Sequence, residues 1–140
     1  MIGILIITHG TLGESLIHCA SHMLNKRPAR LRQLGVTAQD DPLLMVPQAR
    51  AMVKELDSGA GVLILTDMYG GSPSNIAAKL VVPGKVEAVA GLNLPMLVRA
   101  LTYRDKALAT IVNKAVSGGC EGVVRVPAAL AAVQNAATGS

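Results

Sequence analysis

Two short apolar runs that end in the same way place the strongest constraint on this chain. Residues 5–10 read LIITHG, and residues 62–72 read VLILTDMYGGS. Neither run carries a charged side chain until its end, where a threonine, an ionisable residue and then glycine follow. Strands without a polar face are typical of a parallel sheet that helices cover on both sides. His9 and Asp67 therefore mark the carboxyl ends of two buried strands.

Amphipathic segments alternate with further apolar runs along the chain. Predicted strands cover Met1–Ile7, Leu31–Val36, Gly61–Leu65, Val86–Gly91 and Val123–Val126. Predicted helices run from Thr11 or Gly13 to Leu24, from Asp41 or only from Pro47 to Leu56, from Ser72 to Val82, from Pro95 onward and from Asp105 to Val116. The periodicity of the first helix predicts that its buried face consists of Leu12, Leu16, Ala20, Met23 and Leu24.

This alternation predicts one α/β domain over residues 1–126, followed by a C-terminal tail over residues 127–140. We expect a doubly wound, mostly parallel sheet with strand order 2-1-3-4 plus a C-terminal edge strand, and helices on both faces. Ligands bind such sheets beyond the carboxyl ends of the strands, here between the first and third strands. Those strands end at His9 and Asp67. Neighbouring strands lie about 4.8 Å apart, so these two side chains are expected to meet.

The residue types at this edge point to phosphoryl transfer. Asp67 can accept a hydrogen bond from one ring nitrogen of His9 and leave the other nitrogen as a nucleophile. The residues that follow form a candidate phosphate site, because glycine lets backbone N–H groups approach an anion and helix N-termini favour negative charge. These candidate phosphate-binding residues are Gly10, Thr11, Gly70, Gly71 and Ser72, and Ser72 is also the predicted helix cap.

Structural roles are the alternative for each part taken alone. A histidine at the end of a strand is commonly structural or merely exposed, and the sequence GGSP commonly forms a turn that leads into a helix. Asp67 could simply cap that turn. The combination is more specific than its parts, because the fold class brings all three to one edge of the sheet.

The charge and aromatic content argue against nucleic acid as a partner. The net charge is +4, and the clearest basic cluster is KRPARLR at residues 26–32. Tyr69 and Tyr103 are the only aromatic residues of the Phe, Tyr and Trp group that could stack on bases. We therefore expect a solvated basic loop, which could also attract an acidic protein.

The sequence also gives little support for a membrane-spanning helix or a metal site. No apolar run approaches the roughly 20 residues that a membrane helix needs. Cys19 and Cys120 fit no metal spacing and follow no secretion signal, which predicts free thiols in a reducing cytoplasm, with Cys19 packed beside the apolar helix face. His18 and His22 lie one helical turn apart and could bind a metal, but no third ligand is evident. We expect a solvated face there, and no cofactor.

The motifs resemble those of the IIA component of the mannose-type (mannose/fructose/sorbose) phosphoenolpyruvate-dependent sugar phosphotransferase system. The matching segments are ITHG at 7–10, VLILTDMYGGSPSNIAAKLV at 62–81, AVAGLNLPMLVRAL at 88–101 and EGV at 121–123. They cover roughly residues 1–126 in the family's order. THG is a weak signal, whereas D-x-x-G-G-S-P-x-N followed by G-x-N-x-P-M-L is a specific one.

The resemblance implies a cytoplasmic phosphocarrier. His9 would receive a phosphoryl group on its outer nitrogen from the carrier protein HPr and pass it to a IIB component, with Asp67 orienting the ring. It also implies a homodimer that exchanges a terminal strand, no metal or organic cofactor, and contact with a membrane only indirectly, through a permease complex. Tyr69 and Ser74 replace the expected tryptophan and phenylalanine, which affects the identity of the docking partner.

Other functions remain open from the residues. A regulatory protein could use the same site, with the phosphorylation state of His9 controlling the binding of a target. A histidine phosphatase would need an arginine where Thr8 stands, and a response-regulator receiver would need an acidic pair after the first strand. The dihydroxyacetone-kinase phosphocarrier is expected to lack GGSP-x-N.

Overall fold

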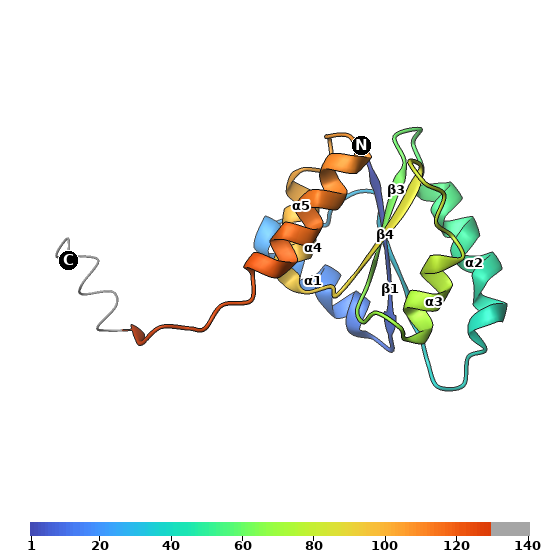
Figure 1. Ribbon diagram of the computed structural model, residues 1–140, viewed down its shortest axis with the longest axis horizontal. Helices are drawn as coiled ribbons and strands as arrows, with labels where there is room; N and C mark the ends of the chain where they lie inside the picture. The colour runs from blue at the N-terminus through green and yellow to red at the C-terminus, as the bar shows by residue number, and fades with distance from the viewer. Residues whose placement is uncertain (130–140) are drawn as a thin grey trace.

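The computed structural model describes residues 1–129, so most of the expected tail over 127–140 lies outside the described residues. Strands and helices alternate through most of the chain (Figure 1). The strands are β1 (Gly3–His9), β2 (Leu31–Val36), β3 (Val62–Thr66) and β4 (Val86–Ala90). The helices are α1 (Leu12–Leu24), α2 (Pro42–Leu56), α3 (Ser72–Ala78), α4 (Leu94–Thr102) and α5 (Leu108–Glu121).

The sheet is all parallel, with strand order β2-β1-β3-β4. In its register Ile4 of β1 lies between Leu31 of β2 and Leu63 of β3. The predicted order 2-1-3-4 and the doubly wound α/β class are confirmed. The chain therefore leaves β1 and β3 toward opposite faces of the sheet, and ligands bind such sheets at this switch point. The carboxyl end of β1 carries His9, and that of β3 leads to Asp67.

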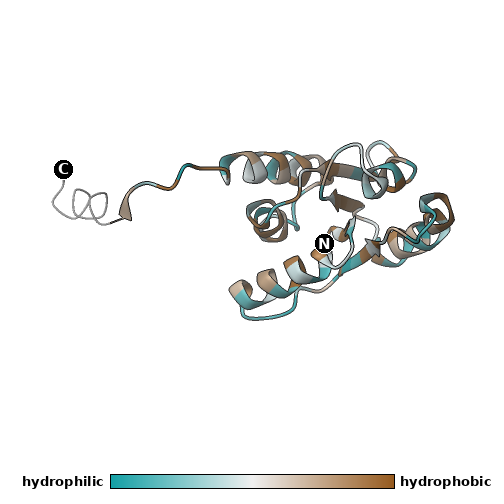
Figure 2. Ribbon diagram, turned by 90° about the horizontal axis from the view of Figure 1, so that it is seen from below, coloured by the Kyte–Doolittle hydropathy of each residue, from teal (hydrophilic) through white to brown (hydrophobic). Residues whose placement is uncertain are grey.

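Two apolar cores lie on opposite faces of the sheet. Ile4 and Ile6 of β1 join the core beneath α1, α4 and α5, whereas Leu5 and Ile7 join the core beneath α2 and α3. Figure 1 shows these two helical layers, and Figure 2 shows hydrophobic colours on strand segments that lie between them. Because β1 is buried on both faces, its side chains are apolar at every position up to Thr8.

The prediction of a C-terminal edge strand is wrong for this single chain, because residues 123–126 form no strand. Helix α5 runs to Glu121, and the segment after it extends away from the body of the domain (Figure 1). The glycines at 118 and 119 do not end the helix as predicted. A Cβ at Gly118 would lie 2.8 Å from Arg99 Cβ, and one at Gly119 would lie 2.7 Å from Met96 Cε. Glycine is needed at position 118 for close packing of α5 on α4, whereas the flexible end of Met96 could move away from a Cβ at position 119.

The predicted buried face of α1 is also corrected. Ala20 is buried as predicted, and Leu16 is half-buried against the same core. Gly13 and Ile17 complete the buried face, whereas Leu12, Met23 and Leu24 are exposed. The face is rotated because Gly13 packs closely over β1, where a Cβ would lie 2.9 Å from Ile6 Cγ2. A glycine contributes nothing to a hydrophobic periodicity, so the sequence pattern included Leu12, Met23 and Leu24 in the buried face and missed Gly13 and Ile17.

Helix starts follow the proline signals with one exception. The Asp41 side chain accepts a hydrogen bond from the Leu43 backbone N–H at 3.0 Å, so α2 begins at Pro42 and runs through Pro47. Asn93 caps α4 in the same way. Ser72 does not cap α3 as predicted; Gly71 is the residue before the helix, and Ser72 is its first residue. Helix α3 ends at Ala78, earlier than the predicted Val82.

Candidate active site

His9 and Asp67 are in direct contact at the carboxyl edge of the sheet. His9 is the last residue of β1, and Asp67 directly follows β3. Oδ2 of Asp67 lies 2.8 Å from the ring Nδ1 of His9 and also accepts a hydrogen bond from the His9 backbone N–H at 3.0 Å. The expected contact is therefore present, and it fixes both the backbone and the ring of the histidine.

The charge of Asp67 determines which ring nitrogen carries the proton. Burial by itself raises the pKa of the Asp67 carboxyl, but the two hydrogen bonds and the attraction of the His9 ring outweigh it and hold the pKa below its ordinary value. An ionised carboxylate only accepts hydrogen bonds, so Nδ1 of His9 must donate. In the neutral ring the lone pair therefore lies on Nε2, which does not face Asp67.

The ring of His9 is held on one side and open on the other. Its side chain is 54% exposed, whereas that of Asp67 is 10% exposed. Gly71 lies against the ring, since a Cβ at that position would come within 3.0 Å of Cε1 and 3.5 Å of Nε2. The contact with Asp67 and the closeness of Gly71 orient an imidazole of which more than half of the side-chain surface remains exposed.

The other predicted phosphate-binding residues flank this pair. Gly10 follows His9 with φ +53°, and Gly70 precedes Gly71 with φ +87°, and at neither would a Cβ meet another atom within 4 Å. Both conformations favour glycine for backbone reasons. Thr11 is the exposed residue before α1, and Ser72 begins α3 half-buried. The structure brings Gly71 onto the ring of His9, places Gly10, Thr11 and Gly70 in the loops after β1 and β3, and places Ser72 at the start of α3.

Two residues that the sequence analysis missed support the loop after His9. The buried Thr8 accepts a hydrogen bond from the Gly13 backbone N–H at 2.8 Å, so its hydroxyl caps the start of α1 from within the strand. Gly35 of β2 lies against the Gly10 carbonyl, where any Cβ would overlap the oxygen. The available signals were a threonine at a strand end and a glycine inside a strand, which often marks a close backbone approach.

Two large, exposed apolar side chains lie in the loop between Asp67 and Gly70. Met68 is exposed, and Tyr69 is 88% exposed, the highest value among the large hydrophobic side chains of the described residues. Leu43 and Leu44 at the start of α2 are exposed as well. Met68 and Tyr69 directly follow Asp67, and large apolar groups exposed beside an exposed histidine indicate a surface that meets another molecule.

The remaining candidates do not assemble into a second reactive site. His18 and His22 are both exposed, and within residues 1–129 no group of three His, Cys, Asp or Glu side chains is arranged to hold a metal ion. Cys19 is exposed, not packed against the core as predicted, and Cys120 is exposed too. None of the helices in the described part of the chain is long and apolar enough to cross a membrane.

Comparisons with known proteins identify relatives of this chain. A family model described as "PTS system fructose IIA component" matches residues 3–116. The PTS system mannose-specific EIIAB component of Escherichia coli (strain K12) is 35% identical over 125 residues, which are 87% of this chain. The chain spans only 38% of the length of that relative.

Solved structures share the fold. The mannose/sorbose specific IIA subunit of the phosphotransferase system from Enterococcus faecalis aligns with TM-score 0.80 and 23% identity, over 91% of this chain and 96% of that one. The PTS IIA protein associated with the fucose utilization operon from Streptococcus pneumoniae aligns with TM-score 0.77 and 27% identity, over 88% and 91% of the two chains.

Proposed function

This chain belongs to the family of mannose-type IIA components of the phosphotransferase system, and we propose that it carries a phosphoryl group on Nε2 of His9. The observation that supports this most directly is the contact of one Asp67 oxygen with both the backbone N–H and Nδ1 of His9. That contact leaves Nε2 as the nucleophilic atom of an exposed ring.

The chemistry requires little from the protein beyond orientation and charge. The Nε2 lone pair attacks the phosphorus of the donor, the bond between phosphorus and the donor breaks, and the ring becomes positively charged. The ionised Asp67 stabilises that charge through Nδ1–H, because it is already in place before the reaction. Gly10, Thr11, Gly70, Gly71 and Ser72 would supply donors to the phosphoryl oxygens. Reversal of these steps delivers the group to an acceptor.

The partners follow from this carrier role. We propose that HPr is the donor and a IIB component the acceptor, since the relative from E. coli is named as an EIIAB component. Met68 and Tyr69 lie in the loop that directly follows Asp67, so a partner that reaches His9 would bury them. Tyr69 is thereby a candidate determinant of which partner docks.

A homodimer is the assembly that we propose. Strand β4 has a neighbour on only one side, and an open sheet edge invites pairing. Val123, Val124 and Val126 are exposed on a segment that leaves the domain, where they could pair with a second subunit. Light scattering at micromolar concentration should give twice the mass of the chain, and a monomer mass would contradict the proposal.

Phosphorylation by purified components tests the carrier role. Incubation with phosphoenolpyruvate, enzyme I and HPr should add one acid-labile, base-stable phosphate per chain. His9→Ala should abolish the label, whereas the exposed His18→Ala and His22→Ala variants should retain it. A His9→Ala protein that still accepts phosphate would exclude the assignment. Loss of the label on addition of a IIB component separates a transport carrier from a purely regulatory protein.

A further inference from the structure

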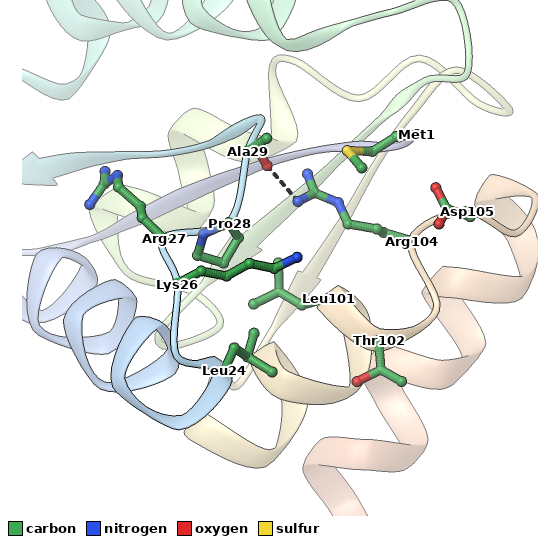
Figure 3. Close-up of a pocket in the computed structure, with 10 residues that line it drawn as sticks. All are labelled: Met1, Leu24, Lys26, Arg27, Pro28, Ala29, Leu101, Thr102, Arg104 and Asp105. Carbon is green, nitrogen blue, oxygen red and sulfur yellow. Dashed lines mark hydrogen bonds between the residues drawn. The ribbon is translucent and has the colours of Figure 1, made fainter.

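A cavity lies at the end of the sheet opposite His9. It has a volume of about 440 Å³ and is open to solvent, within the range of pockets that hold small metabolites. Leu24, Pro28 and Leu101 give it an apolar side, and Lys26 and Arg104 bring positive charge to it (Figure 3).

Arg104 is an unusual lining residue because it is charged and only 5% exposed. Its guanidinium donates hydrogen bonds to the backbone carbonyls of Ile2, Ala29 and Arg30. These bonds connect the turn after α4 to the start of β1 and the loop before β2. One role of Arg104 is therefore structural, and it explains why the side chain is fixed in position.

The hydrogen bonds do not balance the charge of Arg104. A guanidinium has five N–H groups, and four bonds to carbonyls leave one N–H on Nη1 without an acceptor among residues 1–129. Among residues 1–129 no carboxylate lies within ion-pair distance of it. Burial lowers the pKa of Arg104, which the nearby Asp105 opposes and Arg30 reinforces. Charges this deeply buried are normally paired, so an anion would gain from entering here.

The other charged residues around the cavity also favour the binding of an anion. Lys26 and Arg27 line it beside Arg104, against the single carboxylate of Asp105. Figure 3 shows the Lys26 side chain extending across the cavity, whereas the Arg27 guanidinium turns outward. Lys26 therefore has the position to contact a bound anion, and Arg27 contributes mainly through its general field.

We propose that this cavity binds a small metabolite that carries a phosphate or carboxylate group. The oxyanion lies between Lys26 and Arg104, and the body of the ligand lies against Leu24, Pro28 and Leu101. The volume is large enough for a molecule of the size of a sugar phosphate and exceeds what a bare ion would need. This site is independent of the proposed phosphocarrier role, because the length of β1, roughly 20 Å, separates it from His9.

An NMR titration of the full chain with three ligands built on one type of sugar ring tests the site. Glucose 6-phosphate, glucuronate and glucose offer a phosphate, a carboxylate and no charge on similar bodies. At constant ionic strength we expect saturable shifts at the backbone amides of residues 26, 27, 29 and 30 and of residues 101–105 with at least one of the two anions, and none with glucose. The stronger of the two anions identifies the preferred head group. No saturable shift there up to about 10 mM of either anion, or equal shifts with glucose, would overturn the proposal.

Two variants separate a built site from diffuse charge. Lys26→Gln and Arg27→Gln remove the same charge from adjacent exposed positions, so both should leave the fold intact. We expect Lys26→Gln to weaken binding roughly fivefold or more and Arg27→Gln less than about twofold. Equal losses in the two variants would show that the anion responds only to the basic loop. Shifts confined to residues 67–72 would instead place the anion beside His9 and exclude this cavity.

Discussion

One carboxylate oxygen of Asp67 holds His9 at two points, the backbone N–H at 3.0 Å and the ring Nδ1 at 2.8 Å. The backbone contact fixes where β1 ends, and the ring contact fixes the tautomer. Because both contacts involve Oδ2, a change at Asp67 alters the position and the electronic state of the histidine together.

Replacing Asp67 by asparagine should slow phosphoryl transfer without unfolding the chain. Asparagine keeps the size of the side chain but cannot stabilise the positive ring, and its amide group can face the two His9 donors with the wrong atom. We expect a loss on the order of 10²-fold in both acceptance and donation of the phosphoryl group. Rapid-quench phosphorylation measures it, with thermal unfolding as the control. A folded variant with the parent rates would reduce Asp67 to a loop cap.

The stability of the fold should depend on the ionisation of Asp67 in acid. Its pKa is lower in the folded chain than its ordinary value of 3.8, so the ionised form stabilises the fold above that pH. The stabilisation is lost as the pH falls through the folded pKa. The difference in free energy of unfolding between the parent and Asp67→Asn should therefore be larger at about pH 6 than at about pH 2.5. A difference that stays constant in urea titrations at both pH values would contradict this.

Gly71→Ala should impair the histidine more than the fold. The new methyl group would lie 3.0 Å from Cε1 of His9, and the backbone φ of −82° accepts alanine without strain. The ring must shift away, which should lower the phosphorylation rate on the order of tenfold with little change in thermal stability. Lys79→Ala, an exposed change at the other end of the same helix, is the matched control and should keep the parent rate.

Gly35→Ala should disturb both stability and activity. Its Cβ would overlap the carbonyl oxygen of Gly10, so the backbone after His9 has to move, and the 2.8 Å hydrogen bond from the Gly10 N–H to the Val36 carbonyl is put at risk. We expect a loss of about 1–3 kcal/mol in the free energy of unfolding and slower phosphorylation of His9. Urea unfolding measures the change in the free energy of unfolding. An unchanged value would show that β2 can shift at this position without loss of stability.

Local patterns were sufficient for the order of the elements and for the main pair of the site. Uniformly apolar runs identified the buried parallel strands, and the polar residues at the ends of two of them identified His9 and Asp67. Strand order then followed from fold class, because β1 and β3 are neighbours at the switch point of a doubly wound sheet. The strands and the His9–Asp67 pair could be inferred because each depends on a pattern or a strand end that lies within one short segment.

Close approaches between segments were decided only by the tertiary structure. Gly13, Gly35 and Gly118 are needed because a neighbouring segment occupies the place of their Cβ, and a missing side chain leaves no periodic signal. The same limit rotated the predicted face of α1 and ended α5 too early. The sharing of Oδ2 between two His9 donors, and the balance of burial and hydrogen bonding that lowers the pKa of Asp67, likewise arise only when β1 and β3 lie side by side.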